Sequence, residues 1–360
     1  KQKQMATIAV EHKFNKHNIF FIEGAISNDN KNLFSTKDKR DDQGIAVKTK
    51  YHFAMPFSSD ELGWKITGLQ TYSLISENFK AIERFRSVEF ERDWNTKVDN
   101  IGQDEHWVSL LLQLQKGKTV KSKINTSYID RGTSYKALKN DLGLNFNLWK
   151  GGSIKGDASL LNANGLVTSS EFIKHKINLE QVMGPVSLKI WEQQENKLTK
   201  LTDSDSLILS TTNDNFNLLG VKIGSSKERN AQFSTEYIHR YDYLPSKNKM
   251  KLATTADDYG LSFQHQNTKK TSFLKLKSTL RQLHIQDTTL SDKIAENTLL
   301  NRIEYSFKAF KGMISSKTFF ELGTGNELKR EFTYIEVNAG QGIYAWNDYN
   351  NDGIQQLNEF

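Results

Sequence analysis

The residues best suited to chemistry lie in one twelve-residue stretch, Asp348 to Glu359, which reads D-Y-N-N-D-G-I-Q-Q-L-N-E. Oxygen-bearing residues occupy positions 1, 3, 5 and 12, and a glycine occupies position 6, which is the spacing of a calcium-binding loop. Calcium takes six to eight oxygen ligands, and the glycine allows the sharp turn that brings them together. The predicted metal ligands for Ca²⁺ are Asp348, Asn350, Asp352, Ile354 (through its backbone carbonyl) and Glu359.

Two features of the loop are atypical. Position 8 is the polar Gln355, where paired helix–loop–helix sites carry an apolar residue, and the preceding residues 342–346 have the composition of a strand. We therefore expect a single structural loop after a strand, and not a calcium sensor. The alternative is a turn without an ion, because Asn, Asp and Gly favour turns in any case. The closing ligand is followed only by Phe360, so we expect the chain to be part of a longer polypeptide.

Composition narrows the class of protein. The chain has 360 residues, enough for one large or two ordinary domains, and it contains no cysteine. A disulfide framework and thiol catalysis are therefore excluded. No run of apolar residues is long enough for a transmembrane helix, and the first residues are not a signal peptide. Aromatic residues make up 11% of the chain, too many for a disordered protein.

The net charge is +7, which by itself would allow a nucleic acid or an anionic lipid as partner. The lysines and arginines are scattered among acidic and polar residues, and no nucleic-acid-binding signature occurs. We therefore interpret the charge as a solvated surface and predict no nucleic-acid partner.

Alternation with a period of two residues dominates the sequence. In residues 108–115, 142–148 and 233–243 one face is apolar or aromatic and the other is largely polar, although Trp107 and Leu111 fall on a polar face. This pattern is typical of β-strands. We predict an all-β protein, a large antiparallel meander of roughly 16 to 20 strands.

Turn signals divide the alternating segments. The predicted hairpin tips are 116–118, 151–152, 162–165, 267–270 and 311–312, and the predicted longer loops are 27–42, 197–206, 246–258 and 287–297. Residues 78–91 fit a helix or a strand equally well. We assign residues 1–340 to one antiparallel sheet or barrel domain, and residues 341–360 to a strand with the calcium loop.

Long alternating strands with short turns at one end and longer loops at the other are typical of an outer-membrane β-barrel. Closure into a barrel also removes the unpaired edges of a large sheet. Residues 121–130 argue against this, because neither face of that segment is cleanly apolar and a charge facing lipid costs about 2–4 kcal/mol near the midplane. A soluble, elongated β-sheet or sandwich therefore stays open as the alternative.

Two stretches resemble a known group of proteins. The first is R-F-R-S-V-E-F-E-R-D-W at residues 84–94, and the second runs from K-R-E-F-T-Y-I-E-V at 329–337 through G-Q-G-I-Y-A-W at 340–346 to the calcium loop. Together they resemble segments of very large, mostly uncharacterised outer-membrane or cell-surface proteins of Bacteroidota. The resemblance implies a location in a Gram-negative envelope. It implies no catalytic residues.

No catalytic constellation stands out. The eight histidines lack zinc-binding spacing, and no nucleophile elbow or phosphate-binding loop occurs. The carboxylate pairs Asp203/Asp205, Asp257/Asp258, Glu192/Glu195 and Glu327/Glu331 read as solvated residues. We predict a non-enzymatic protein of the outer membrane or cell surface, a membrane barrel that transports or scaffolds an envelope assembly. Its expected partner is membrane lipid, with other envelope proteins as a further candidate. The alternatives are a soluble adhesin or glycan-binding protein, or a sheet-based glycoside hydrolase.

Overall fold

A computed structural model gives the fold of the chain. It describes residues 2–30, 42–57, 62–83, 85–87, 89–96, 102–201, 215–226, 230–246, 249–291, 293–325 and 345–349. The chain divides into two compact units, residues 1–323 and 324–360. In the second unit, the described residues 345–349 belong to no strand or helix. The strand predicted ahead of the calcium loop covers residues 342–346, and residues 342–344 lie outside the described ranges.

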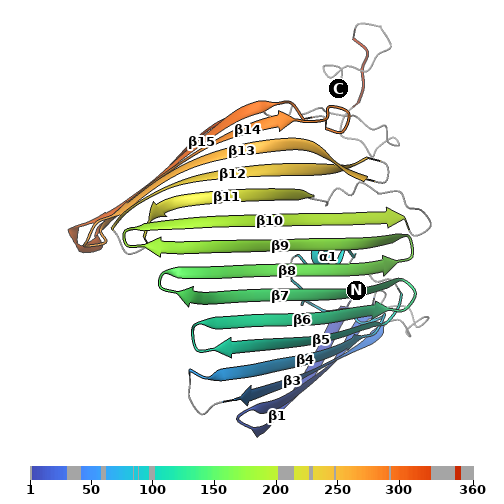
Figure 1. Cartoon of the computed structure of the whole chain (residues 1–360). Helices are drawn as coiled ribbons and strands as arrows, with labels where there is room; N and C mark the ends of the chain where they lie inside the picture. The colour runs from blue at the N-terminus through green and yellow to red at the C-terminus, as the bar shows by residue number, and fades with distance from the viewer. Residues whose placement is uncertain are drawn as a thin grey trace. The chain divides into compact units, whose positions relative to one another are not determined.

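In the described part of the chain, sixteen strands form one sheet in the first unit, and β16 ends just beyond that unit (Figure 1). Their bounds are β1 Gln2–Asn15, β2 Asn18–Asn30, β3 Gln43–Pro56, β4 Trp64–Ile75, β5 Glu105–Lys116, β6 Val120–Arg131, β7 Tyr135–Trp149, β8 Gly152–Gly165, β9 Thr168–Met183, β10 Val186–Leu201, β11 Phe216–Ser225, β12 Ala231–Ser246, β13 Lys249–Gln266, β14 Ser272–Ile285, β15 Glu296–Ala309 and β16 Ile314–Thr324. Each strand is hydrogen-bonded to its neighbours in the sequence, in the order β1 to β16. The predicted all-β antiparallel meander is confirmed.

The longer connections all leave one end of the sheet. They comprise residues 31–42, 76–104, 202–215 and 286–295, while tight turns such as 150–151 and 184–185 close the opposite end. Four predicted hairpin tips lie at observed turns or within one residue of them: 116–118, 151–152, 267–270 and 311–312. The fifth predicted tip, residues 162–165, belongs to β8. Among the described residues, no helix is long and apolar enough to cross a membrane.

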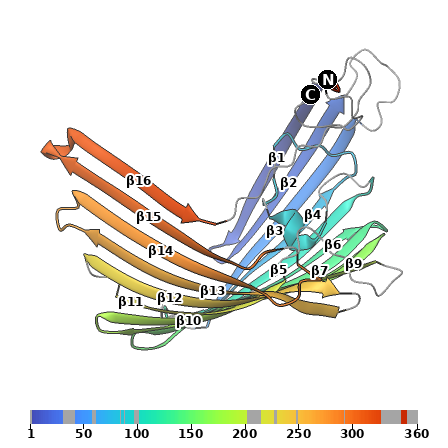
Figure 2. The same ribbon diagram turned by 90° about the horizontal axis from the view of Figure 1, so that it is seen from above.

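The sheet is strongly curved, and α1 (Phe90–Trp94), the one α-helix among the described residues, lies on its concave side (Figure 2). Lys174 of β9 forms an ion pair with Asp93 of α1, so its side of the sheet is the concave face. Residues directly opposite each other in an antiparallel pair share a face. The registers, such as Ser159↔Lys174↔Glu195, therefore assign every paired residue to the concave or the convex face.

The two faces differ sharply in chemistry. The convex face carries large apolar side chains that are exposed: Val108, Leu110, Ile124, Leu138, Leu142, Leu160, Ile177, Leu179, Ile190, Leu219, Ile223, Leu261, Leu276 and Ile303. The concave face of β6–β11 carries Lys121, Lys123, Lys139, Lys155, Lys174, Lys176, Lys189, Lys197 and Lys222, together with Asp141, Asp157, Glu180 and Glu195. This polarity is the reverse of that of a soluble sheet wrapped around a core.

Titratable side chains at the middle of the convex face of β9–β13 are hydrogen-bonded to one another. His175 Nε2 lies 2.7 Å from a carboxylate oxygen of Glu192, and His239 Nδ1 lies 2.6 Å from Asp257 Oδ1. The Tyr237 hydroxyl donates a hydrogen bond to the same Asp257 oxygen, at 2.6 Å. Part of the hydrogen-bonding capacity of these polar groups, which lie on a largely apolar face, is therefore satisfied within the sheet.

Two more expectations from the sequence need correction. Residues 246–258 were predicted as a loop, but β13 begins at Lys249, and the connection from β12 is confined to residues 247–248. Pairing with both β12 and β14 holds this polar segment in the sheet despite its composition. In β6, Lys121 and Lys123 point to the concave face while Ile124 and Tyr128 point to the convex face, so the lysines of this strand do not face outward. Its one outward carboxylate, Asp130, lies near the end of the strand and forms an ion pair with Lys136 at 3.2 Å.

Candidate functional site on the concave face

The connection between β4 and β5 includes a segment that folds back onto the concave face. We call residues 76–96 the inward segment. Its described residues before Phe90 form no strand or helix. Of the segment 78–91, for which the composition allowed a helix or a strand, only residues 90–91 are helical among the described residues, as the start of α1. The helix ends at Asn95, whose backbone is left-handed (φ 45°) and whose N–H donates to the carbonyl of Arg92 at 3.3 Å.

Aromatic packing anchors the inward segment to the sheet. Phe90 and Trp94 are 3% and 5% exposed, and the ring centroid of each lies 6.1 Å from that of Trp107 on β5. They form one buried cluster with Ile129, Tyr135, Ala137, Leu161, Ala163 and Phe172. The Tyr135 hydroxyl also donates a hydrogen bond to the backbone carbonyl of Trp94. The presence of Trp107 on a largely polar face is thus explained, because that face is locally covered.

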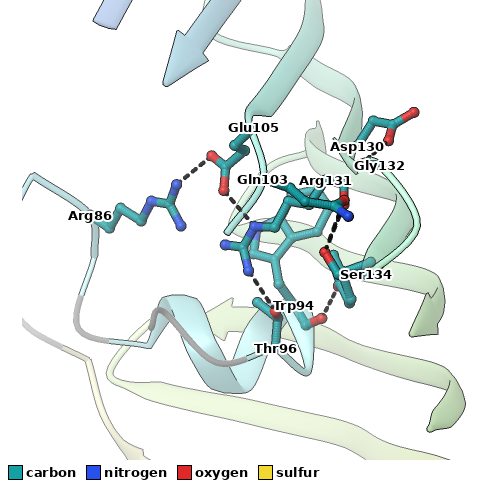
Figure 3. Close-up of polar contacts among 10 residues, drawn as sticks. Arg86, Trp94, Thr96, Gln103, Glu105, Asp130, Arg131, Gly132 and Ser134 are labelled. Carbon is teal, nitrogen blue, oxygen red and sulfur yellow. Dashed lines mark hydrogen bonds and ion pairs between the residues drawn. The ribbon is translucent and has the colours of Figure 1, made fainter. Parts of the chain in front are cut away.

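Beside the aromatic cluster, one carboxylate joins two arginines (Figure 3). Glu105, the first residue of β5, accepts a hydrogen bond from Arg86 of the inward segment, and its other oxygen accepts one from Arg131 Nε of β6 at 2.7 Å. The three side chains are only 5–8% exposed. Arg131 Nη1 also donates to the Thr96 hydroxyl, at 3.0 Å. We call Arg86, Glu105 and Arg131 the arginine–glutamate cluster.

Buried ion pairs bring little net stability when intact, but they are costly to break, because the remaining charge stays out of water. The cluster joins the inward segment to the start of β5 and to the end of β6. It therefore acts as a fixed attachment point for the segment.

Further ion pairs join α1 to strands on the other side of the helix. Asp93 lies 2.7 Å from the ammonium of Lys174 and 3.8 Å from that of Lys139, while Arg92 Nη2 lies 2.6 Å from Glu195 Oε2. These partners come from β9, β7 and β10. The inward segment is therefore attached to β5, β6, β7, β9 and β10, and it narrows the space above the concave face there.

The concave face below the helix is hollowed and rich in lysine. A cavity of about 580 Å³ is lined by Lys123, Lys174, Lys176, Asn125, Asp157 and Glu195, among others. Lys123 is 3.9 Å from Asp157, and both side chains are more than half exposed, so this pair is screened by water. Because lysines outnumber carboxylates on the concave face of β6–β11, the local potential favours anions.

Of the predicted calcium ligands, only Asp348 belongs to the described residues. Asn350, Asp352, Ile354 and Glu359 lie outside them, so the calcium loop stays a prediction. Within the described ranges, no group of three or more His, Asp or Glu side chains is arranged to hold a metal.

Two of the carboxylate pairs considered from the sequence are separated by the sheet. Glu192 bonds His175 on the convex face while Glu195 bonds Arg92 on the concave face. Asp257 bonds His239 on the convex face, whereas Asp258 bonds Arg281 on the concave face at 2.7 Å. Neither pair meets in one site. Asp203, Asp205, Glu327 and Glu331 lie outside the described residues.

Sequence reasoning missed the aromatic cluster and the arginine–glutamate cluster. One signal was available: Trp107 and Leu111 interrupt a polar face, which indicates that something apolar covers that face. The sequence does not identify the covering segment, because Phe90 and Trp94 lie in a stretch without strand periodicity.

No protein-family model matches the chain, and no curated protein sequence is significantly similar to it. Several solved structures match over most of the chain. OccAB3 of Acinetobacter baumannii matches with a TM-score of 0.36 and 10% identity, over 89% of this chain and 92% of that one. OccK9 (OpdG) of Pseudomonas aeruginosa matches with a TM-score of 0.37 and 8% identity, over 88% and 91%. OpdK of P. aeruginosa, crystallised with vanillate, matches with a TM-score of 0.36 and 8% identity, over 89% and 93%. These three proteins are outer-membrane porins.

Proposed function

We propose that the sheet is the wall of an outer-membrane β-barrel that transports solutes. The observation that carries this proposal is the polarity of the sheet: the convex face is apolar and exposed, and the concave face is charged. In water such a face would expose apolar surface on strand after strand, which soluble proteins avoid. In a bilayer the same face meets hydrocarbon, and the charged face lines an aqueous lumen.

The solutes favoured by this lumen are anionic. The lysines of β6–β11 face inward, and the inward segment narrows the passage beside them. Lysine side chains raise the local concentration of anions and speed their entry, an effect that falls as ionic strength increases. We therefore expect the reconstituted barrel to pass anions in preference to cations.

An arginine on the convex face tests the membrane proposal. Leu110, halfway along β5, is 41% exposed on the convex face, whereas Gln113 of the same strand is exposed on the concave face. We expect Leu110→Arg to lower the free energy of unfolding in lipid by about 2–4 kcal/mol and Gln113→Arg to change it little. Equilibrium unfolding by guanidinium in phospholipid vesicles measures both. Equal effects of the two substitutions would argue against a lipid-facing convex surface.

Extraction provides an independent check. We expect the native protein to remain with the membrane fraction until detergent is added. A monomer that is fully soluble without detergent would instead favour the soluble adhesin or glycan-binding alternative, in which exposed tyrosines of the convex face stack on sugars.

The calcium loop belongs to the same proposal as a structural element, supported by the spacing of its ligands. We expect Asp352→Ala to weaken calcium binding and to lower the melting temperature only when calcium is present. Differential scanning calorimetry with and without chelator measures this. A wild-type melting temperature that does not change on adding chelator would contradict it. The resemblance to Bacteroidota envelope proteins and a scaffold role for other envelope proteins stay predictions.

A further inference from the structure

A second cavity lies where the first half of the inward segment spans the concave face of β1–β5. It has a volume of about 860 Å³, and its walls come from residues 79–83 and 85–87 on one side and from the sheet on the other. Its sheet wall includes Thr7, Ala25, Ala46, Thr71 and Trp107. The volume lies within the range of sites that bind drug-sized molecules.

The inward segment exposes apolar side chains around this cavity. Phe85 is 60% exposed and Ile82 is 53% exposed, although Phe90 of the same segment is 3% exposed. Phe90 in the second half of the segment therefore packs against the sheet, whereas Phe85 and Ile82 in the first half remain exposed to water. Covering Phe85 and Ile82 with an apolar molecule would remove apolar surface from water, which is favourable.

Two neighbouring lysines supply positive charge to the cavity. Lys48 and Lys50 of β3 both line it, and the ammonium of Lys50 lies 5.3 Å from the ring centroid of Phe21. Within the part of the chain that the structure describes, neither ammonium forms an ion pair. The lining also contains Glu23 and Glu83, and Arg86, which is bound by Glu105. Because Arg86 is already paired, the remaining two lysines and two carboxylates balance, and the site for an anion is the neighbouring pair Lys48 and Lys50 on β3.

We propose that this cavity binds a small amphiphilic anion, with an aromatic or aliphatic body packed against Phe85, Ile82 and Trp107 and one acidic group held by Lys48 and Lys50. The apolar walls supply most of the binding free energy, and the lysines select the charge of the ligand. The cavity belongs to the inner side of the sheet, so the inference does not depend on whether the convex face meets lipid.

Three probes of one shape separate the contributions of charge and apolar contact: 2-naphthoate, neutral 2-naphthol and cationic 2-naphthylmethylammonium. Equilibrium dialysis of the full chain in nanodiscs, with empty nanodiscs as blank, measures each dissociation constant. We expect 2-naphthoate to bind about tenfold more tightly than either of the other probes, as for a hydrogen bond to a charged group.

Three variants distinguish the roles of the residues. Lys48→Gln combined with Lys50→Gln is expected to remove the preference for 2-naphthoate and to leave binding of 2-naphthol unchanged. Phe85→Ala is expected to weaken binding of all three probes several-fold. Lys65→Gln serves as the control, because Lys65 lies on the concave face of β4 outside the cavity lining. Circular dichroism verifies that each variant is folded.

Two results would overturn the inference: an absence of 2-naphthoate binding to the wild type, or the same 2-naphthoate affinity in the wild type and the double lysine variant. Failure of the membrane proposal would show itself separately, in the comparison of Leu110→Arg with Gln113→Arg and in the extraction experiment.

Discussion

Replacing Glu105 with alanine is expected to lower the free energy of unfolding by about 3–5 kcal/mol. The substitution removes the carboxylate that Arg86 and Arg131 share while leaving two arginines in a site that is only 5–8% exposed. Because Arg86 belongs to the inward segment, we expect the segment to detach before the sheet unfolds. Guanidinium titration in detergent micelles, followed by tryptophan fluorescence, measures the global change.

Trypsin gives a local readout of the same variant. In the wild type, Arg86 and Arg92 are held by Glu105 and Glu195, so cleavage after them should be slow. In Glu105→Ala we expect cleavage at both positions to be faster. Glu89→Ala is the matched control, because Glu89 is 61% exposed and its pair with Arg92 at 3.8 Å contributes less than about 1 kcal/mol. Equal effects of the two substitutions would show that the arginine–glutamate cluster does not hold the segment.

Trp94→Ala is expected to destabilise the protein by about 3–5 kcal/mol, because it leaves a large cavity beneath α1. The indole is 5% exposed, and it packs against Phe90 and Trp107. The same guanidinium titration measures the loss. Phe57→Ala, at a position that is 65% exposed after β3, provides the comparison and should have a small effect. A loss below about 1 kcal/mol for Trp94→Ala would mean that the aromatic cluster does not anchor the segment.

The two substitutions act on one attachment, so their effects should not add. Once the inward segment is detached by Glu105→Ala, Trp94 has already lost its partners on the sheet. The double variant is therefore expected to lose less free energy than the sum of the single variants, as in other coupled sites. Additive effects would place the two clusters in separate cooperative units.

The strands could be predicted because their side chains alternate in chemistry. In β7, the apolar Leu138, Leu142 and Leu144 share the convex face, so period-two reasoning identifies both the strand and its two faces. The same reasoning failed at residues 246–258, where polar residues occupy both faces of β13. There the pairing with neighbouring strands, which sequence composition does not report, keeps the chain extended.

The site was less predictable, because it depends on contacts between residues far apart in the sequence. Glu195 binds Arg92 from 103 residues away, and Lys174 binds Asp93 from 81 residues away. In the sequence, the scattered lysines indicated a solvated surface. Only the strand registers show that the lysines of β6–β11 lie together on the concave face. The predicted calcium ligands other than Asp348 lie outside the described residues and remain to be tested by experiment.

The order of the strands has a consequence for biogenesis. Since each strand pairs only with the strands before and after it, the sheet can lengthen one hairpin at a time from an existing edge. No later strand has to be threaded between two that are already joined, so each addition closes only a short loop of chain. The long 76–104 connection is the exception. Glu105 can bind Arg131 only after β6 has been added, so the inward segment becomes fixed later than the β4–β5 hairpin to which it belongs.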